Sequence, residues 1–282
     1  MIKGLSNAGL GKVRNVEELV LLASKNGFGV IDTSGQELRD FIGEKGLEEA
    51  RMFLEKHQME IGSIGLGVEW RQSDAKFREG LATLLEDAKI AAEFGCTSCC
   101  TYVLPSTDNN AAHFMVLATK RLKLCAQILK EYGINLGLEY VGPHHLRTAW
   151  KNPFIWDLQS TLDWIDAIGE PNVGLLLDSY HWYTAGETYE DLIALKPSQI
   201  THVHLNDAKD VPIEEVLDND RVYPGEGVID LASFLKALNE IGYKGPIVQE
   251  ILTKEPLNES NDVLAEKSGK AFDMIFTTAE II

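Results

Sequence analysis

Four side chains of types that bind divalent metal ions stand at the ends of four short apolar runs in the second half of the chain. They are Glu139 in NLGLEYVG, Asp178 in NVGLLLDSYHW, His204 in THVHLND and Glu250 in PIVQEIL. Taken singly, each is more typical of a surface or loop-capping group. At four consecutive strand ends of one barrel, however, they would converge at its mouth. Three buried carboxylates beside one imidazole need a compensating positive charge.

This set predicts a site for one divalent metal ion. An oxygen-rich site with a single nitrogen suits Mn²⁺, Mg²⁺ or Co²⁺, and Zn²⁺ can also occupy it. The alternation of side chains along a strand places the apolar residues of 135–141 on one face and Glu139 on the opposite, inward face. His202 and His204 share a face, with His204 one layer nearer the mouth. We therefore predict His204 as the ligand and His202 as its support.

Two further side chains are candidates for substrate binding. His181 follows Asp178 by three residues in DSYHW, where we expect a loop, and it could hydrogen-bond a substrate hydroxyl. Arg221, in DNDRVYPGEG, could clamp a substrate oxygen. The alternatives are a loop histidine already satisfied by its neighbours, and an ion pair of the arginine with Asp218, Asp220 or Glu226. Three aromatic residues are candidate walls of a sugar pocket: Trp70, Trp182 and Tyr223.

The elements that must position these groups alternate along the whole chain between β-rich apolar runs and amphipathic segments. The expected strands are 2–5, 29–32, 60–64, 97–103, 135–141, 173–178, 201–205 and 247–251. The expected helices are 16–26, 46–57, 74–94, 111–132, 158–168, 189–195, 231–241 and 263–279. About eight such β-then-α units predict an α/β fold, a (β/α)₈ TIM barrel in a single domain over residues 1–282.

Two connections are longer than a barrel needs, at 142–156 and 207–228. They follow the fifth and seventh expected strands, and such loops form the pockets of barrel enzymes. The competing fold is a doubly wound open sheet, which usually has a glycine-rich phosphate turn after its first strand. Here the first strand runs into SNAGLGK, which lacks the full pattern. The barrel is therefore favoured.

The composition excludes several classes of partner. The chain has 282 residues and a formal net charge of −17, so nucleic acid and anionic membrane surfaces would be repelled. It has no apolar run long enough to span a bilayer, and MIKGLSNAGL has no apolar signal region. Four cysteines, three of them in CTSCC, are expected to be ordinary buried thiols. We expect a cytoplasmic protein, and the sequence is compatible with a homo-oligomer.

Four segments carry a resemblance to a known family: GLEYVG, NVGLLLDSYHWYTAG, HVHLNDAKD and DNDRVYPGEGVID. They resemble the sugar phosphate isomerase/epimerase family of xylose isomerase-like TIM barrels. The likeness is strong over 139–250 and mostly at the level of the fold before that. It implies one divalent metal ion, most often Mn²⁺, and a small sugar or polyol ketone as substrate. The implied ligands are Glu139, Asp178, His204 and Glu250, and the implied substrate-binding residues are His181 and Arg221.

The reaction expected from this resemblance is the isomerisation of ketoses such as inososes through an enediolate, with proton transfer by Glu139 and Glu250. The sequence does not decide which glutamate is the base. A ketohexose 3-epimerase or an inosose dehydratase would use the same metal ligands. The family's ketohexose 3-epimerases carry a second glutamate soon after the first ligand, whereas this chain reads YVGPHHLRT. More remote possibilities are a metal-dependent endonuclease and a non-catalytic sugar binder.

Overall fold

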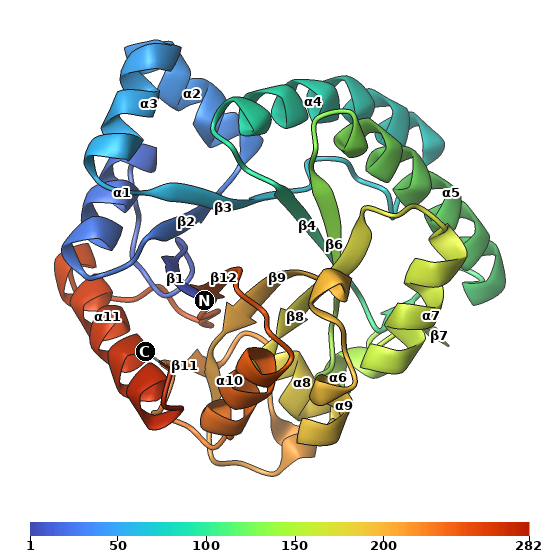
Figure 1. Ribbon diagram of the computed structural model, residues 1–282. Coiled ribbons are helices and arrows are strands. Elements are labelled where there is room, and N and C mark those ends of the chain that lie inside the picture. The colour runs from blue at the N-terminus through green and yellow to red at the C-terminus, as the bar shows by residue number, and fades with distance from the viewer. Residues whose placement is uncertain (282) are drawn as a thin grey trace.

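Eight short runs rich in Val, Ile and Leu form a closed parallel barrel in the computed structural model, which describes residues 1–281 (Figure 1). The strands are β1 (Ile2–Leu5), β2 (Val30–Thr33), β3 (Glu60–Gly65), β4 (Ser98–Val103), β6 (Asn135–Tyr140), β8 (Val173–Asp178), β9 (Ile200–Leu205) and β12 (Pro246–Gln249). Their order around the barrel is β1-β12-β9-β8-β6-β4-β3-β2, so each strand pairs with its neighbours in the sequence and β12 closes onto β1. The predicted (β/α)₈ fold is confirmed.

Helices form a ring around this barrel, and the last helix lies beside the first (Figure 1). They are α1 (Val16–Lys25), α2 (Gly35–Lys45), α3 (Leu47–Lys56), α4 (Asp74–Glu93), α5 (Ala111–Lys130), α6 (His144–Arg147), α7 (Leu158–Ile168), α8 (Ser179–Ala185), α9 (Tyr189–Ile193), α10 (Leu231–Glu240) and α11 (Asn261–Thr278). Short 3₁₀ turns lie at Pro197–Gln199 and Ile213–Glu215. No helix of residues 1–281 has the length and apolarity needed to cross a bilayer.

The expected helices did not include α2, between β2 and β3. Its buried side chains are few, Leu38 and Phe41, so its apolar periodicity is weak. The helix begins instead with a capping box, in which Ser34 accepts from the N–H of Glu37 and the Glu37 side chain accepts from the N–H of Ser34. Local hydrogen bonding therefore sets the start of this helix where the hydrophobic pattern is too sparse to indicate it.

A second correction concerns α8, which starts directly at the end of β8. The Asp178 side chain accepts a hydrogen bond from the N–H of Tyr180 at 2.6 Å and caps the helix, and Gly186 ends it in the left-handed conformation with φ 76°. His181 therefore lies in a helix and not in the predicted loop. Its side chain is 2% exposed, because the helix turns it back over the barrel mouth.

Two short antiparallel pairs lie outside the barrel, one joining the segment after β4 to the first long connection and one within the second long connection. β5 (Ser106–Thr107) pairs with β7 (Asn152–Pro153), and β10 (Asp207–Ala208) pairs with β11 (Arg221–Val222). The second connection is tied to the buried Asp207, whose carboxylate accepts four backbone N–H bonds at 2.9–3.0 Å. The donors are Ala208, Gly225, Gly227 and Ile229. The loop that carries Arg221 is thus held by one carboxylate.

The four cysteines are all free thiols, as expected. Cys96, Cys99 and Cys125 are buried and Cys100 is half-buried. Burial raises the pKa of Cys96, Cys100 and Cys125 to about 12, so these thiols stay protonated near neutral pH and are poor nucleophiles.

A largely buried carboxyl group, Glu187, lies outside the barrel, between β6 and the start of α7. It accepts from the hydroxyl of Tyr140 and, at 2.6 Å, from the N–H of Leu158. Burial raises the pKa of Glu187 to about 7 against these bonds. The folded chain therefore keeps a proton on Glu187 that the unfolded chain has already released above about pH 4.3. The resulting stabilisation is complete below that pH and is lost as the pH rises through about 7.

Glu187→Gln removes this titration. We expect the free energy of unfolding of the parent to fall, relative to the variant, by about 1–3 kcal/mol between about pH 5 and pH 8. Urea unfolding at several pH values measures the difference, with the exposed Glu190→Gln as the control. Parallel pH profiles for the parent and Glu187→Gln would contradict this prediction.

Candidate metal centre

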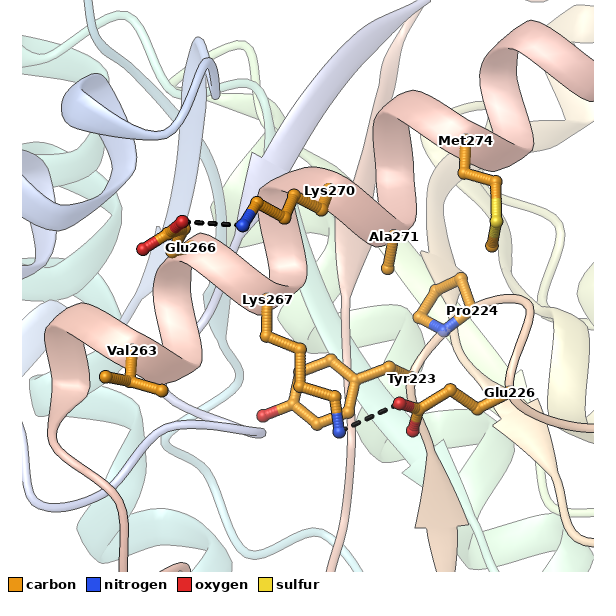
Figure 2. A pocket seen from close by; sticks show the side chains of 9 residues that line it. All are labelled: Tyr223, Pro224, Glu226, Val263, Glu266, Lys267, Lys270, Ala271 and Met274. Carbon is orange, nitrogen blue, oxygen red and sulfur yellow. Dashed lines mark ion pairs between the residues drawn. The ribbon is translucent and has the colours of Figure 1, made fainter.

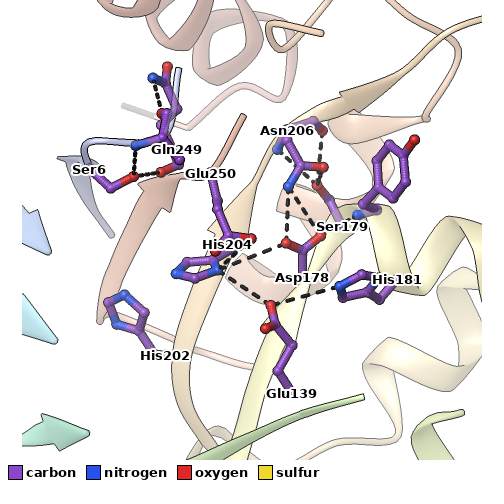
Figure 3. Close-up of polar contacts among 12 residues, drawn as sticks. Ser6, Glu139, Asp178, Ser179, His181, His202, His204, Asn206, Gln249 and Glu250 are labelled. Atoms are coloured by element: carbon purple, nitrogen blue, oxygen red, sulfur yellow. Dashed lines mark hydrogen bonds and ion pairs between the residues drawn. The ribbon is translucent and has the colours of Figure 1, made fainter. Parts of the chain in front are cut away.

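The structure brings the four predicted ligands together at the carboxyl end of the barrel (Figure 3). Glu139 comes from β6, Asp178 from the end of β8 and His204 from β9, and Glu250 directly follows β12. The Nδ1 atom of His204 lies 3.4 Å from Glu139 Oε1, 3.4 Å from Glu250 Oε2 and 3.9 Å from Asp178 Oδ2. One ligand atom from each residue lies within 4.8 Å of the others.

Two atoms at the centre of this group have unused bonding capacity. Glu139 Oε1 and His204 Nδ1 are both buried, and neither has a hydrogen-bond partner among the described residues. Such atoms are rare in folded proteins, because an unsatisfied buried polar atom costs free energy. A divalent cation between them would satisfy both, and three carboxylates with one imidazole form a suitable donor set. The residues therefore fit a metal ion.

The charges at the centre act differently on the two glutamates. Burial, together with the nearby Glu250 carboxylate, raises the pKa of Glu139. Burial also acts to raise the pKa of Glu250, but His204 and the Arg221 guanidinium outweigh it and hold that pKa well below its usual range. Glu250 thus pairs with both His204 and the Arg221 guanidinium, whereas the ion-pair partners of Glu139 are the imidazoles of His204 and His181.

Asp178 is oriented by hydrogen bonds to both of its oxygens. The amide of Asn206 donates to Oδ1 at 3.2 Å and to Oδ2 at 3.0 Å, and the N–H of Tyr180 donates to Oδ1. The Asp178 side chain is fully buried. These donors hold Oδ2 towards His204 and fix the carboxylate in one orientation.

The ring of His181 has a donor near each of its nitrogens. The backbone N–H of Gly142 donates to Nδ1 at 3.3 Å, and the Arg221 guanidinium lies 3.4 Å from Nε2. A ring hydrogen on Nε2 agrees with the Gly142 bond, in which case the contact with Arg221 is not a hydrogen bond. Nε2 lies 4.0 Å from both Glu139 Oε1 and Asp218 Oδ1. In this tautomer His181 presents a hydrogen-bond donor to the centre, as expected for a group that would bind a substrate oxygen.

Arg221 forms the ion pair that was considered for it and also contacts two carboxylates of the centre. Its guanidinium pairs with Asp218 at 2.8 Å, as in the ion-pair alternative, but it also donates to Asp178 at 2.9 Å and Glu250 at 2.8 Å. It lies over the Tyr180 ring at 4.8 Å, and its side chain is 1% exposed. The remaining acidic candidates pair with lysines, Asp220 with Lys209 and Lys254, and Glu226 with Lys267.

One acidic residue near the centre is absent from the set predicted from the sequence. Asp32, on β2, places Oδ2 2.8 Å from Nε2 of His202 and 3.4 Å from Nε2 of His204. Burial opposes ionisation of Asp32, but the two imidazoles outweigh it and lower its pKa. The sequence could have indicated Asp32, because this residue is a carboxylate at the end of the expected strand 29–32. His202 lies below His204, fully buried, where it was expected (Figure 3).

A cavity of about 200 Å³ opens over the centre. It is lined by Ser6, Asp32, Thr33, Ser63, Ile64, Gly65, Cys100, Thr101, Tyr102, Glu139, Leu176, His204 and Glu250. Its volume is below the roughly 300–1,000 Å³ of typical drug-sized sites, so it suits a single small ring. The aromatic side chain at this cavity is Tyr102, which is 47% exposed and stacks against the Arg71 guanidinium at 3.9 Å.

None of the three candidate aromatic walls lines the cavity over the centre. Trp70 stacks on Phe114 in the helix layer, and Trp182 packs against Phe234 of α10. Tyr223 lines a separate cavity of about 410 Å³ beside α11. Two lysines of α11 lie at this cavity, and each is paired with a glutamate, Lys267 with Glu226 and Lys270 with Glu266 (Figure 2). This cavity is larger than the one at the barrel mouth, but its charges are already paired. The convergent polar groups lie at the barrel mouth.

A sequence model described as xylose isomerase-like TIM barrel matches residues 20–269. The chain belongs to this family. An inosose isomerase of Bacillus velezensis is 28% identical to this chain over 251 residues, which cover 86% of this chain and 85% of that protein. A ketose 3-epimerase of Arthrobacter globiformis is 25% identical and covers 64% of this chain and 57% of its own length. These relatives confirm the expectation of an isomerase.

Solved structures of the xylose isomerase-like family superpose over nearly the whole chain. A xylose isomerase domain protein from Alicyclobacillus acidocaldarius subsp. acidocaldarius has a TM-score of 0.91 and 31% identity, and 99% of each chain is covered. An IOLI protein with a bound zinc atom has a TM-score of 0.82 and 21% identity, again with 99% of each chain covered. At that identity the second comparison shows the shared fold.

Proposed function

We propose that this chain is a divalent-metal-dependent isomerase of ketoses such as inososes, acting by proton transfer between adjacent carbons. The observation that carries the proposal is the set of three carboxylates around His204 Nδ1, at 3.4–3.9 Å, beneath a small cavity. The inosose isomerase relative supports the substrate class, and the zinc bound in the IOLI structure supports metal binding by a protein of this fold.

Glu139, Asp178, His204 and Glu250 would hold the ion. When bound, it would polarise the substrate carbonyl and stabilise negative charge on the substrate oxygens of an enediolate. The two glutamates come from strands on either side of His204, so they can flank the substrate. One carboxylate takes the proton from the hydroxyl-bearing carbon beside the carbonyl, the hydroxyl proton moves to the former carbonyl oxygen, and a carboxylic acid returns a proton to the former carbonyl carbon. His181 Nε2–H and the Arg221 guanidinium orient the substrate oxygens.

Chelation tests the dependence on a metal ion. We expect EDTA-treated protein to lose isomerase activity and to recover it with Mn²⁺, our proposed ion, or in part with Mg²⁺, Co²⁺ or Zn²⁺, because the donor set accepts all four. Steady-state rates after dialysis against each ion measure this recovery. Full activity in EDTA, with metal content shown to be below one-tenth of the protein concentration, would contradict the proposal.

Proton NMR in D₂O with 2-keto-myo-inositol tests the reaction itself. The isomerase reaction exchanges the hydrogen beside the carbonyl for deuterium and produces a second inosose. Loss of water to a diketone would indicate a dehydratase on the same metal site. If inosose does not react, fructose and tagatose test the 3-epimerase reaction, which the ketose 3-epimerase relative supports.

A nuclease and a non-catalytic sugar binder fit the site less well than an isomerase. A nuclease needs a basic surface for the phosphate backbone, whereas this chain carries a net charge of −17 and the cavity is lined by Asp32, Glu139 and Glu250. A non-catalytic sugar binder breaks no C–H bond, so deuterium exchange would exclude it. Free buried thiols are consistent with a cytoplasmic enzyme, which is the location that we propose.

A further inference from the structure

Asp32 reaches the metal centre from the other side of the barrel. It lies on β2, which is separated from β9 by β1 and β12 in the order of the strands. Its Oδ2 atom contacts Nε2 of His202 at 2.8 Å and Nε2 of His204 at 3.4 Å. His204 therefore has Asp32 at one ring nitrogen and the candidate metal ligands at the other.

We propose that Asp32 is a positioning residue of the metal centre, which accepts the Nε2–H of His204 and thereby leaves Nδ1 free to bind the ion. This inference rests on the metal site of the proposed function. In a neutral imidazole only one nitrogen carries hydrogen, so a carboxylate at Nε2 decides that Nδ1 keeps its lone pair. The same contact fixes the orientation of the ring and raises its basicity as a ligand.

Two neighbouring residues keep the Asp32 carboxylate beside His204. His202 donates to the same oxygen from the layer below, and its side chain is fully buried. Gly62 on the neighbouring strand β3 leaves the necessary space, because a Cβ at this position would lie 2.7 Å from Asp32 Oδ1 and 2.4 Å from Val30 Cγ1. The Asp32 side chain is 14% exposed, so water competes little for its oxygens.

A second metal ion between Asp32, His202 and His204 is the competing interpretation, since these residues also form a group with ligand atoms within 4.8 Å. The contact with His202 favours a hydrogen bond, and the 3.4 Å contact with His204 is longer than the usual range of about 2.7–3.2 Å. The 2.8 Å separation of His202 Nε2 and Asp32 Oδ2 is a normal N–H···O length. Two ions would also require His204 to lose both ring hydrogens and to bridge the ions as an imidazolate, whereas a single ion leaves the Nε2 hydrogen for Asp32. We therefore expect one ion per chain.

Calorimetric titration with Mn²⁺ tests the proposal without using turnover. We expect Asp32→Asn to bind Mn²⁺ about 10–100-fold more weakly than the parent. The physical reason is that the Asn amide can donate to Nε2 and so shift the hydrogen of His204 to Nδ1. The matched control is Asp87→Asn, because Asp87 is a buried carboxylate that pairs with Arg39 in the helix layer. Its Mn²⁺ affinity should stay within twofold of the parent.

A measurement on the parent guards against a variant that fails to fold. In Zn²⁺-loaded protein labelled with ¹⁵N-histidine, we expect an Nε2–H signal from His204 that exchanges slowly with water, identified by its loss in His204→Gln. A His204 ring without hydrogen on Nε2, two ions bound per chain, or an Asp32→Asn affinity equal to the parental value would each overturn the proposal. Tight Mn²⁺ binding without any inosose turnover would contradict the proposed function and leave this inference intact.

Discussion

Glu139→Gln and Glu250→Gln are each expected to lower kcat for inosose by about 10²–10⁴-fold, the usual contribution of a positioned acid or base. Glutamine keeps the size of the side chain and one oxygen near His204, but it cannot accept or return the proton. Rates are to be measured at Mn²⁺ concentrations that saturate each variant, since both residues also face the ion. Under those conditions the loss reflects proton transfer and not an empty site.

Glu60→Gln is the matched control for these variants. Glu60 is an exposed glutamate at the start of β3, at the opposite end of the barrel, and its substitution should leave kcat unchanged. A folded Glu139→Gln or Glu250→Gln enzyme that turns over inosose at the parental rate would contradict the assignment of that glutamate. A different pH dependence of kcat in the two variants would then identify which of them acts as the base.

Arg221→Met is expected to lower the free energy of unfolding of the metal-free protein by about 3–5 kcal/mol, the usual cost of removing one partner of a buried ion pair. Arg221 pairs with three carboxylates, those of Asp178, Asp218 and Glu250. Methionine fills much of the same space but leaves these charges without a cation. Urea unfolding in EDTA measures the loss.

Saturating Mn²⁺ should restore part of the stability of Arg221→Met, because an ion that binds only the folded state stabilises it and supplies the missing positive charge. The control is Arg14→Met, since the Arg14 side chain is 80% exposed and its substitution should change stability by at most about 0.5 kcal/mol. Equal stability of Arg221→Met and the parent in EDTA would contradict the electrostatic role given to this arginine.

The barrel could be predicted because each repeat has a local signal, an apolar strand followed by an amphipathic helix. The position of Glu139 also followed from local information, since the alternation of side chains along β6 is enough to place it inside the barrel. Strand ends of a barrel meet at one mouth whatever the lengths of the helices. Four ligands could therefore be assembled before any distance was known.

Contacts across the barrel could not be predicted in the same way. Asp32 contacts His204 over 172 positions of sequence, and the choice among strand ends depends on the strand order and on the space left by Gly62. The positions of the three candidate aromatic walls could not be predicted for a related reason. Whether Trp70 faces the mouth or the helix layer is decided by its packing against Phe114 and by its bond to Thr101, not by its place in the chain.

The contacts of Arg221 could be predicted from the sequence only in part. Its pairing with Asp218, three residues away, is visible as a local charge pattern. The bonds to Asp178 and Glu250 depend on the fold of the long connection after β9, and only the structure shows that one guanidinium serves both sets.

The attachment of that connection to Asp207 has a consequence for how the enzyme works. A loop whose backbone donates four hydrogen bonds to one buried carboxylate has little freedom to open and close as a lid. Arg221 is then in place before a substrate arrives, and the entropy of ordering the loop is lost once, during folding, and not at each encounter. The part of the barrel rim that this connection forms therefore keeps one shape, and any selection of ligands by this connection depends on that shape and not on the closing of a flap.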